Sequence, residues 1–190
     1  MKKLVLVALA VVLMASSAFA KAEMKVKVGL ETGGTISDSY GSNDMDMGFG
    51  VAGELLFPVG SMIKVGPGIG VSIANISQDF YMKYFGITET LTSIPIYATV
   101  EVTPIKAVPG IFFKGNLGLN IGSLSVSGPS GLVGSSSSGA GLYYGIAAGY
   151  DFPFGLFLEA MYSGNGAAES GGGTLTYSKV TLSAGYKFKL

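Results

Sequence analysis

The residues of this chain best suited to chemistry are lysines and acidic residues spaced at even intervals within apolar segments. Between Lys25 and Glu31, the uncharged residues Val26, Val28 and Leu30 alternate with charged residues or glycine. Alternate side chains of a β-strand point to opposite faces, so this spacing gathers charge on one face and hydrocarbon on the other. Charges gathered in this way can form ion pairs, select ions or, where two carboxylates meet, transfer protons.

We predict that the charged faces point inward and that their charges pair. The expected ion-pair network comprises Lys27, Glu31, Glu54, Lys64, Glu101, Lys114, Glu159, Lys179 and Lys187, and the same spacing places Lys25 and Asp151 inward. Buried charges need partners or water. Two interpretations stay open: a network that mostly plugs the interior, or a narrow pore for small solutes or ions. Side chains can fill the interior of an eight-stranded barrel, which favours the plug, although inward glycines leave some space.

The composition argues against catalysis and against a cofactor. The chain contains no histidine and no cysteine. A Ser-His-Asp triad, a histidine general base and a His or Cys metal site are therefore excluded. Glu54 and Glu101 could act as an acid–base pair only at close approach, and pairing with lysine is their simpler role. The 12 basic and 12 acidic residues balance, which gives no reason to expect a nucleic-acid partner.

The N-terminus has the features of a secretory signal peptide. Lys2 and Lys3 precede an apolar run over residues 4–15, and Ala18-Phe19-Ala20 provides a cleavage motif. The apolar run is shorter than a membrane-spanning helix requires. We expect residues 1–20 to be a signal peptide and residues 21–190 to form one domain.

The segments that follow predict an all-β fold of about eight strands. Period-two alternation predicts strands over residues 23–35, 45–57, 62–76, 91–102, 111–126, 141–152, 154–163 and 174–190, with a bulge at Pro67. The expected connections alternate in length: 58–61, 103–110 and 153 are shorter than 37–44, 77–90, 127–139 and 164–173. This rhythm is typical of membrane-spanning, antiparallel up-and-down β-barrels.

Alternation alone does not say which face of the strands is inside. A soluble, lipocalin-like ligand carrier of the periplasm, with its apolar face inward, is therefore the alternative to a membrane barrel. Only 13% of the residues are charged, against roughly a quarter in soluble proteins, which favours the membrane barrel. Aromatic residues near the expected short turns, among them Tyr150, Phe152 and Tyr186, suit a membrane–water interface.

The chain resembles the small outer-membrane β-barrels of the OmpA/OmpX type. The resemblance rests on Ile-Pro-Ile-Tyr at 94–97, Gly-Asn-Leu-Gly-Leu-Asn at 115–120 and Ser-Ala-Gly-Tyr-Lys-Phe at 183–188. It implies an integral outer-membrane protein of a Gram-negative-type bacterium, with a structural or surface-interaction role. The implied partners are outer-membrane lipid, lipopolysaccharide, periplasmic chaperones and the barrel-assembly machinery. Tyr186, Phe188 and Leu190 would form the C-terminal assembly signal, although family members often end on an aromatic residue.

One expected external loop carries a group of aromatic residues. Phe80, Tyr81, Tyr84 and Phe85 lie between two predicted strands. Exposed aromatic residues often mark interaction sites, so these side chains could contact an unidentified surface ligand. The alternative is that they cover the rim of the barrel or enter the lipopolysaccharide interface.

Overall fold

The computed structural model describes residues 21–37, 42–76, 86–104, 109–128, 137–168 and 174–190 of this 190-residue chain. Their regular structure consists of β-strands: β1 (Glu23–Ser37), β2 (Ser42–Met45), β3 (Gly48–Pro58), β4 (Ile63–Asn75), β5 (Thr88–Val102), β6 (Ile111–Ser127), β7 (Ser137–Asp151), β8 (Leu156–Ala168) and β9 (Thr174–Lys189). No helix within these ranges is long and apolar enough to cross a membrane.

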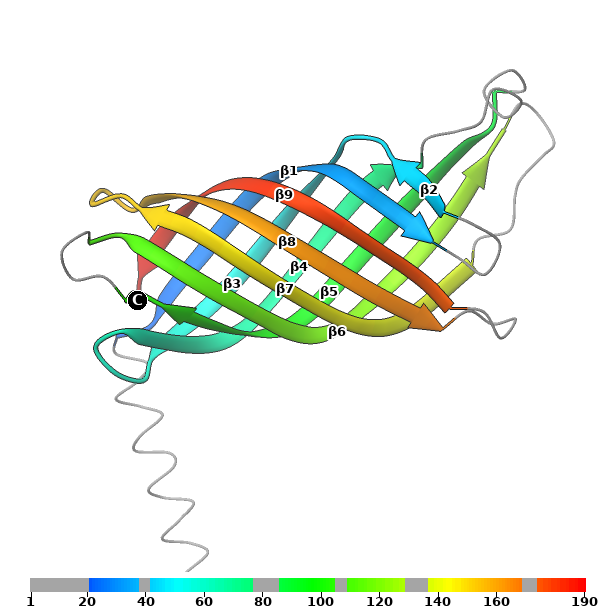
Figure 1. The fold of residues 1–190 in the computed structure, drawn as a ribbon. Coiled ribbons are helices and arrows are strands. Elements are labelled where there is room, and N and C mark those ends of the chain that lie inside the picture. Colours follow the sequence, from blue (N-terminus) through cyan, green and yellow to red (C-terminus); the bar gives the residue numbers. More distant parts are fainter. Residues whose placement is uncertain (1–20, 38–41, 77–85, 105–108, 129–136, 169–173) are drawn as a thin grey trace, which may run out of the picture.

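The strands form one closed antiparallel barrel. Each strand from β3 to β8 pairs with the next one along the chain, and β1 pairs with both β3 and β9. Figure 1 shows the result, with the first long strand, in blue, beside the last, in red. The short β2 pairs with the end of β1, and β3 pairs with the rest of it. Because β2 and β3 occupy the same position beside β1, the barrel wall is eight strands around. Closure removes the unpaired edges that an open sheet would leave.

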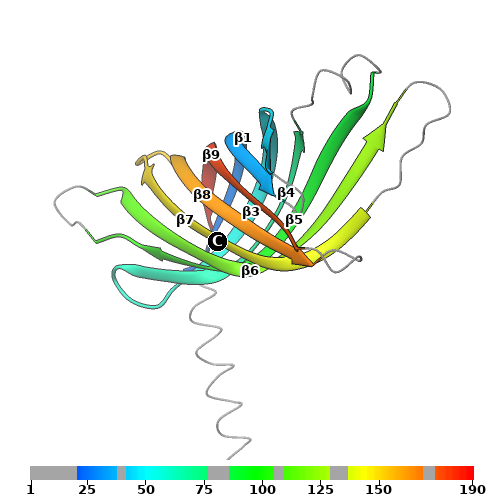
Figure 2. The ribbon, with the colours of Figure 1, turned by 45° about the vertical axis from the view of Figure 1, so that its right-hand side comes forward.

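The two rims of the barrel differ. Ala22 and Leu190 meet at one rim, where the Leu190 amide donates to the Ala22 carbonyl at 2.9 Å; we call this the terminal rim and the opposite one the distal rim. Figure 2 shows β5 and β6 extending beyond the other strands at the distal rim. These two strands stay paired as far as Thr88 and Ser127. The distal rim is therefore uneven, whereas at the terminal rim residues 59–62 join β3 to β4 and residues 152–155 join β7 to β8.

The predicted strands are present, but several of their bounds are wrong. Asp46 and Met47 separate β2 from β3 within the expected strand over 45–57, and β8 begins at Leu156 rather than at 154. At the distal rim β1, β5, β7 and β8 run further than expected. Residues at these strand ends, such as Ser137 and Thr88, are polar and lack a clear apolar alternation. Ladder pairing with a neighbouring strand, which the sequence does not reveal, extends them.

The predicted bulge at Pro67 is absent. Glu54 pairs with Gly68 and Phe57 pairs with Val65, so the register of β3 and β4 is the same on both sides of the proline. Because proline has no N–H, the ladder is interrupted there without an inserted residue. The backbone carbonyl of Leu55 approaches Gly66 so closely that a Cβ atom would lie 1.7 Å from it. Glycine at position 66 therefore lets the two strands stay in register.

The apolar and polar faces lie as predicted. On β1, Val28 and Leu30 are each 59% exposed on the outside, while Lys25, Lys27 and Glu31 are buried inside. Inward glycines make room for inward aromatic rings: the Tyr97 ring lies over Gly68, the Phe112 ring over Gly149 and the Phe157 ring over Gly185. The outer surface of the barrel is thus apolar, and its interior is filled by polar, charged and aromatic side chains. This inverts the usual arrangement of a soluble protein.

Candidate functional site

The centre of the interior is a ring of two lysines and two glutamates. The Lys27 ammonium group lies 2.9 Å from a Glu54 oxygen and 2.5 Å from a Glu159 oxygen. The Lys114 ammonium group lies 2.7 Å and 2.6 Å from the other oxygens of the same two carboxylates. The four residues come from β1, β3, β6 and β8. Only β1 and β3 are neighbours in the wall, so the ring connects opposite sides of the barrel.

This ring extends toward the terminal rim through further ion pairs. Glu101 lies 2.8 Å from Lys25 and 3.2 Å from Lys64, and the Lys114 ammonium approaches it to 3.8 Å. Asp151 lies between Lys25, at 2.9 Å, and Lys187, at 2.6 Å. Lys64 also contacts Glu23 at 2.7 Å. We call the ten connected residues the lysine–carboxylate network: Glu23, Lys25, Lys27, Glu54, Lys64, Glu101, Lys114, Asp151, Glu159 and Lys187.

The network is electrically balanced and held by its surroundings. It contains five lysines and five carboxylates, and every one of them has an opposite charge within 4 Å. The Lys25 ammonium lies 4.0 Å from the centre of the Phe112 ring and 4.9 Å from that of Phe157. The Tyr97 hydroxyl donates to Glu54 at 3.0 Å. Buried charges are stable only with such complete pairing, because an unpaired one costs several kcal/mol.

A second, smaller charged group lies nearer the distal rim. The Lys179 ammonium donates to Glu31 at 2.6 Å and to the Ser72 hydroxyl at 2.7 Å. The other Glu31 oxygen, Oε2, is buried without a hydrogen-bond partner. Among the described residues, no ion pair joins this group to the lysine–carboxylate network, so the described interior contains two separate layers of charge.

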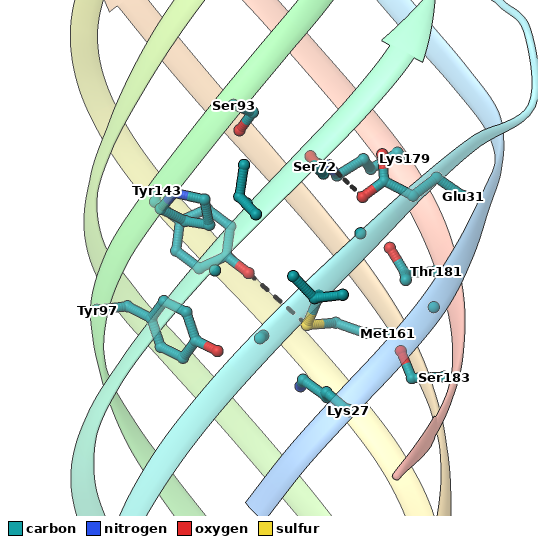
Figure 3. Close-up of a pocket in the computed structure, with 17 residues that line it drawn as sticks. Lys27, Glu31, Ser72, Ser93, Tyr97, Tyr143, Met161, Lys179, Thr181 and Ser183 are labelled. Atoms are coloured by element: carbon teal, nitrogen blue, oxygen red, sulfur yellow. Dashed lines mark hydrogen bonds and ion pairs between the residues drawn. The ribbon is translucent and has the colours of Figure 1, made fainter.

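A cavity of about 50 Å³ lies between the two layers. Figure 3 shows Lys27 on one side of it and the Glu31–Lys179 pair on the other, with Tyr97, Tyr143 and Met161 around it. The Tyr143 hydroxyl donates to the Met161 sulfur at 3.7 Å. Since a buried water needs about 10–15 Å³, the cavity has room for a few water molecules only. Extending it into a water-filled path requires movement of the charged side chains on both sides.

Beyond the second layer the interior becomes apolar toward the distal rim. The Ser93 hydroxyl donates to Asn120 at 2.7 Å and also hydrogen-bonds the hydroxyl of Tyr177. Tyr177 then packs in a cluster with Ile36, Met45, Ala74, Ile76 and Leu91. These inward apolar residues fill the described part of the interior on the distal side of the ion pairs.

The structure places the charged residues of the predicted ion-pair network inside the barrel. All of them form ion pairs there, and they divide between the two layers. Glu31 and Lys179 form the separate pair, and the others belong to the lysine–carboxylate network. Glu23 was missed, although it lies two residues before Lys25 and therefore on the same face. Lys25 and Asp151 were predicted to point inward, and the structure joins them to the network through Glu101 and Lys187.

Two further predictions concern the rims. Phe80, Tyr81, Tyr84 and Phe85 lie outside the described residues. Tyr186, Phe188 and Leu190 point outward at the terminal rim, where the rings of Tyr186 and Phe188 lie 4.9 Å apart. Tyr150, Phe152 and Phe154 form a neighbouring aromatic group, with ring centres 5.0 and 5.5 Å apart. The role of the C-terminal residues in assembly remains a prediction.

The fold and its inverted polarity agree with the comparison to known families. Residues 5–188 match the family described as the outer membrane protein beta-barrel domain. The chain therefore belongs to this family of outer-membrane β-barrels. The comparison with curated protein sequences found no match.

Solved structures support the same fold. The attachment invasion locus protein Ail of Yersinia pestis has a TM-score of 0.61 and 15% identity, over 88% of this chain and 99% of that one. Neisserial surface protein A also has a TM-score of 0.61 and 15% identity, over 88% of this chain and 97% of that one. A major outer membrane protein from Thermus thermophilus follows with a TM-score of 0.54, 14% identity and coverage of 88% and 99%. At these identities the likeness establishes the fold alone, a small closed antiparallel β-barrel.

Proposed function

We propose that this protein is a closed structural barrel of the outer membrane, which presents its distal rim to partners at the cell surface. The observation that carries the proposal is the lysine–carboxylate network, whose central ring joins opposite walls through contacts of 2.5–2.9 Å. A conducting path would have to separate these charges. The apolar cluster around Tyr177 adds a second obstruction.

The name of one structurally similar protein supports the surface role. Ail is called an attachment invasion locus protein. In our proposal the residues of this chain that contact a partner lie at the distal rim, and Phe80, Tyr81, Tyr84 and Phe85 remain candidates. We further propose that residues 1–20 direct export, that chaperones and the barrel-assembly machinery insert the chain, and that the terminal rim faces the periplasm.

A narrow pore for ions is the second candidate function. The cavity between Lys27 and the Glu31–Lys179 pair is the observation that favours it, because it already interrupts the packed interior. Conduction through it would require the two charged layers to open. We propose no enzymatic role, since the chain lacks histidine and cysteine and its central carboxylates are engaged by lysines.

Conductance of the purified protein in planar lipid bilayers separates the two candidates. The closed barrel predicts no reproducible channel events for the wild type. Glu101→Gln and Lys114→Gln each leave one buried charge less well compensated and are compared with it, and Thr32→Val, on the outer face of β1, is the matched control. Steady, charge-selective conductance that changes in Glu101→Gln or Lys114→Gln but not in Thr32→Val would establish the pore and refute the closed barrel.

A further inference from the structure

The outer face of the barrel changes character near the distal rim. Along β9 the outward residues are apolar up to Leu182 and Val180 and then become the hydroxyl residues Ser178 and Thr176. β1 changes in the same way, from Val28 and Leu30 to Thr32, Thr35 and Ser37. A surface that faces lipid tails is apolar, so this change marks the level at which lipid headgroups begin.

A groove of about 430 Å³ lies at this level on β1, β7, β8 and β9. Outward residues of these strands form most of its lining, and the inward Asn165 and Tyr177 also border it. Its centre follows one row of ladder partners: Tyr144 pairs with Gly164, Gly164 with Ser178, and Ser178 with Thr35. A side chain at Gly164 would collide with the Tyr144 ring, because a Cβ atom there would lie 2.4 Å from the tyrosine hydroxyl. Glycine therefore allows the Tyr144 ring to lie against the wall.

The chemistry of the groove combines aromatic rings with hydroxyl groups. Tyr144 and Tyr162 are 46% and 45% exposed, so part of each ring is accessible to a ligand. The Thr35 and Ser178 hydroxyls lie 3.2 Å apart, and Ser37 and Thr176 add two more along the same side. None of the described residues that line the groove is charged. Tyrosine, with an apolar ring and a polar hydroxyl group, is suited to a site between lipid and water.

We propose that this groove binds the sugar headgroup of a glycolipid in the outer leaflet of the membrane. A sugar ring offers apolar C–H faces to the tyrosine rings and hydroxyl groups to the threonine and serine side chains. An anionic phosphate headgroup would find no cation among the described lining residues. The groove continues directly from the lipid-facing surface, so the tail of the same molecule would lie along Val180, Leu182 and Leu30.

The test measures which lipid the purified barrel retains. The protein is placed in phosphatidylcholine nanodiscs that contain equal small amounts of a monoglucosyl diacylglycerol and a phosphatidylglycerol with the same acyl chains. Native mass spectrometry of the released protein then counts the bound lipids. We expect one glucosyl lipid to be retained in preference to phosphatidylglycerol.

Variants assign the binding to the groove. Tyr144→Leu, and separately the pair Thr35→Val with Ser178→Ala, should each lower retention of the glucosyl lipid about fivefold, the effect of roughly one lost hydrogen bond or ring contact. Thr32→Val on β1 and Phe113→Leu on β6 are the controls, since both residues face outward but lie outside the groove. The mobility of each variant in SDS gels, unheated and heated, shows whether it has folded. If Tyr144→Leu does not fold, the double variant with Thr35→Val and Ser178→Ala provides the test.

Equal retention of the two lipids by the wild type would overturn the proposal, as would unchanged retention in both groove variants. The result is independent of whether the interior conducts, because the bilayer measurement reports on the interior and lipid retention reports on the outer face.

Discussion

The two halves of the barrel interior are stabilised in different ways. Toward the terminal rim, ten charges form the lysine–carboxylate network, and each has a partner. Between this network and the apolar cluster of the distal rim, hydroxyl and amide groups surround the Glu31–Lys179 pair. Several of their atoms have no hydrogen-bond partner: Asn116 Oδ1, Asn120 Nδ2, Ser163 Oγ, Thr181 Oγ1 and both polar atoms of Asn165. The hydroxyl of Thr99, the ladder partner of Asn116, also has no hydrogen-bond partner.

This difference indicates where the interior can change at low cost. Breaking one pair in the charged half leaves an uncompensated buried charge, which costs several kcal/mol. The distal half already contains buried polar atoms without partners, so water entry there satisfies groups that are otherwise unpaired. Any rearrangement of the interior should therefore begin between the cavity and the distal rim, and the charged half should remain fixed.

The largest predicted effect is on the central ring. Lys114→Met removes the cation that contacts both Glu54 and Glu159, leaving Lys27 as their one cation in the ring. The free energy of unfolding should fall by about 3–5 kcal/mol. Urea unfolding of the barrel in lipid vesicles, followed by gel mobility, measures this loss.

A double variant separates lost charge from lost packing. Glu159→Gln added to Lys114→Met removes one charge of each sign and should recover part of the stability, with a coupling of about 0.5–3 kcal/mol. Lys179→Met is the distal comparison and should cost less than Lys114→Met, because it breaks one ion pair rather than three and Glu31 lines the cavity, where water can solvate its carboxylate. Equal losses for Lys114→Met and Lys179→Met would contradict the difference between the two halves.

The next effect compares inward packing at two glycines. A Cβ atom at Gly149 would lie 2.3 Å from the Phe112 ring and 2.4 Å from the Leu158 carbonyl. Gly149→Ala should therefore destabilise the barrel by about 1–3 kcal/mol. At Gly122, toward the distal rim, the nearest atom would lie 3.6 Å away, and Gly122→Ala should change stability by less than about 0.5 kcal/mol. The same unfolding assay tests both, and a larger loss for Gly122→Ala would refute the prediction.

The last predicted effect has the opposite sign. Ser163 is fully buried and its hydroxyl has no partner. Ser163→Ala removes this unsatisfied group and should raise the unfolding free energy by about 1 kcal/mol. Thr99→Val should behave similarly, because the Thr99 hydroxyl is also buried without a partner. A loss of stability in Ser163→Ala would indicate that its hydroxyl is hydrated, and the distal half would then be wetter than the contacts suggest.

The sequence predicts the face of each residue better than its partner. Period-two alternation places Lys27, Glu54 and Lys114 inside, because the direction of a side chain depends on its own strand alone. The contact between Lys27 and Glu159, 132 positions apart, depends on the closed curvature of the whole barrel and could not be derived from spacing. For the same reason, spacing alone does not predict that Asp151 joins Lys25 to Lys187.

Strand ends were predicted less well than strand centres. Pro67 was expected to force a bulge, yet Gly66 permits a close strand approach that preserves the register, a property of the pair of strands rather than of the proline. Asp46 and Met47 separate β2 from β3, although no proline or run of glycines at these positions indicates a break in the strand. The groove beside Tyr144 was also missed, because its residues come from four strands and meet only in the barrel wall.

The pairing of β1 with β9 has a consequence for the order of folding. Glu23 pairs with Lys189, so the seam joins the beginning and the end of the domain. Loop-closure entropy opposes pairing between strands so far apart in the sequence, and a partly folded barrel that lacks β9 cannot contain this pairing. Until β9 arrives, β1 and β8 each expose an edge that can pair with another chain. The barrel can therefore close only when all of its strands are present. We expect the pairing of β1 with β9 to be the slow step, during which exposed strand edges make the chain prone to aggregation.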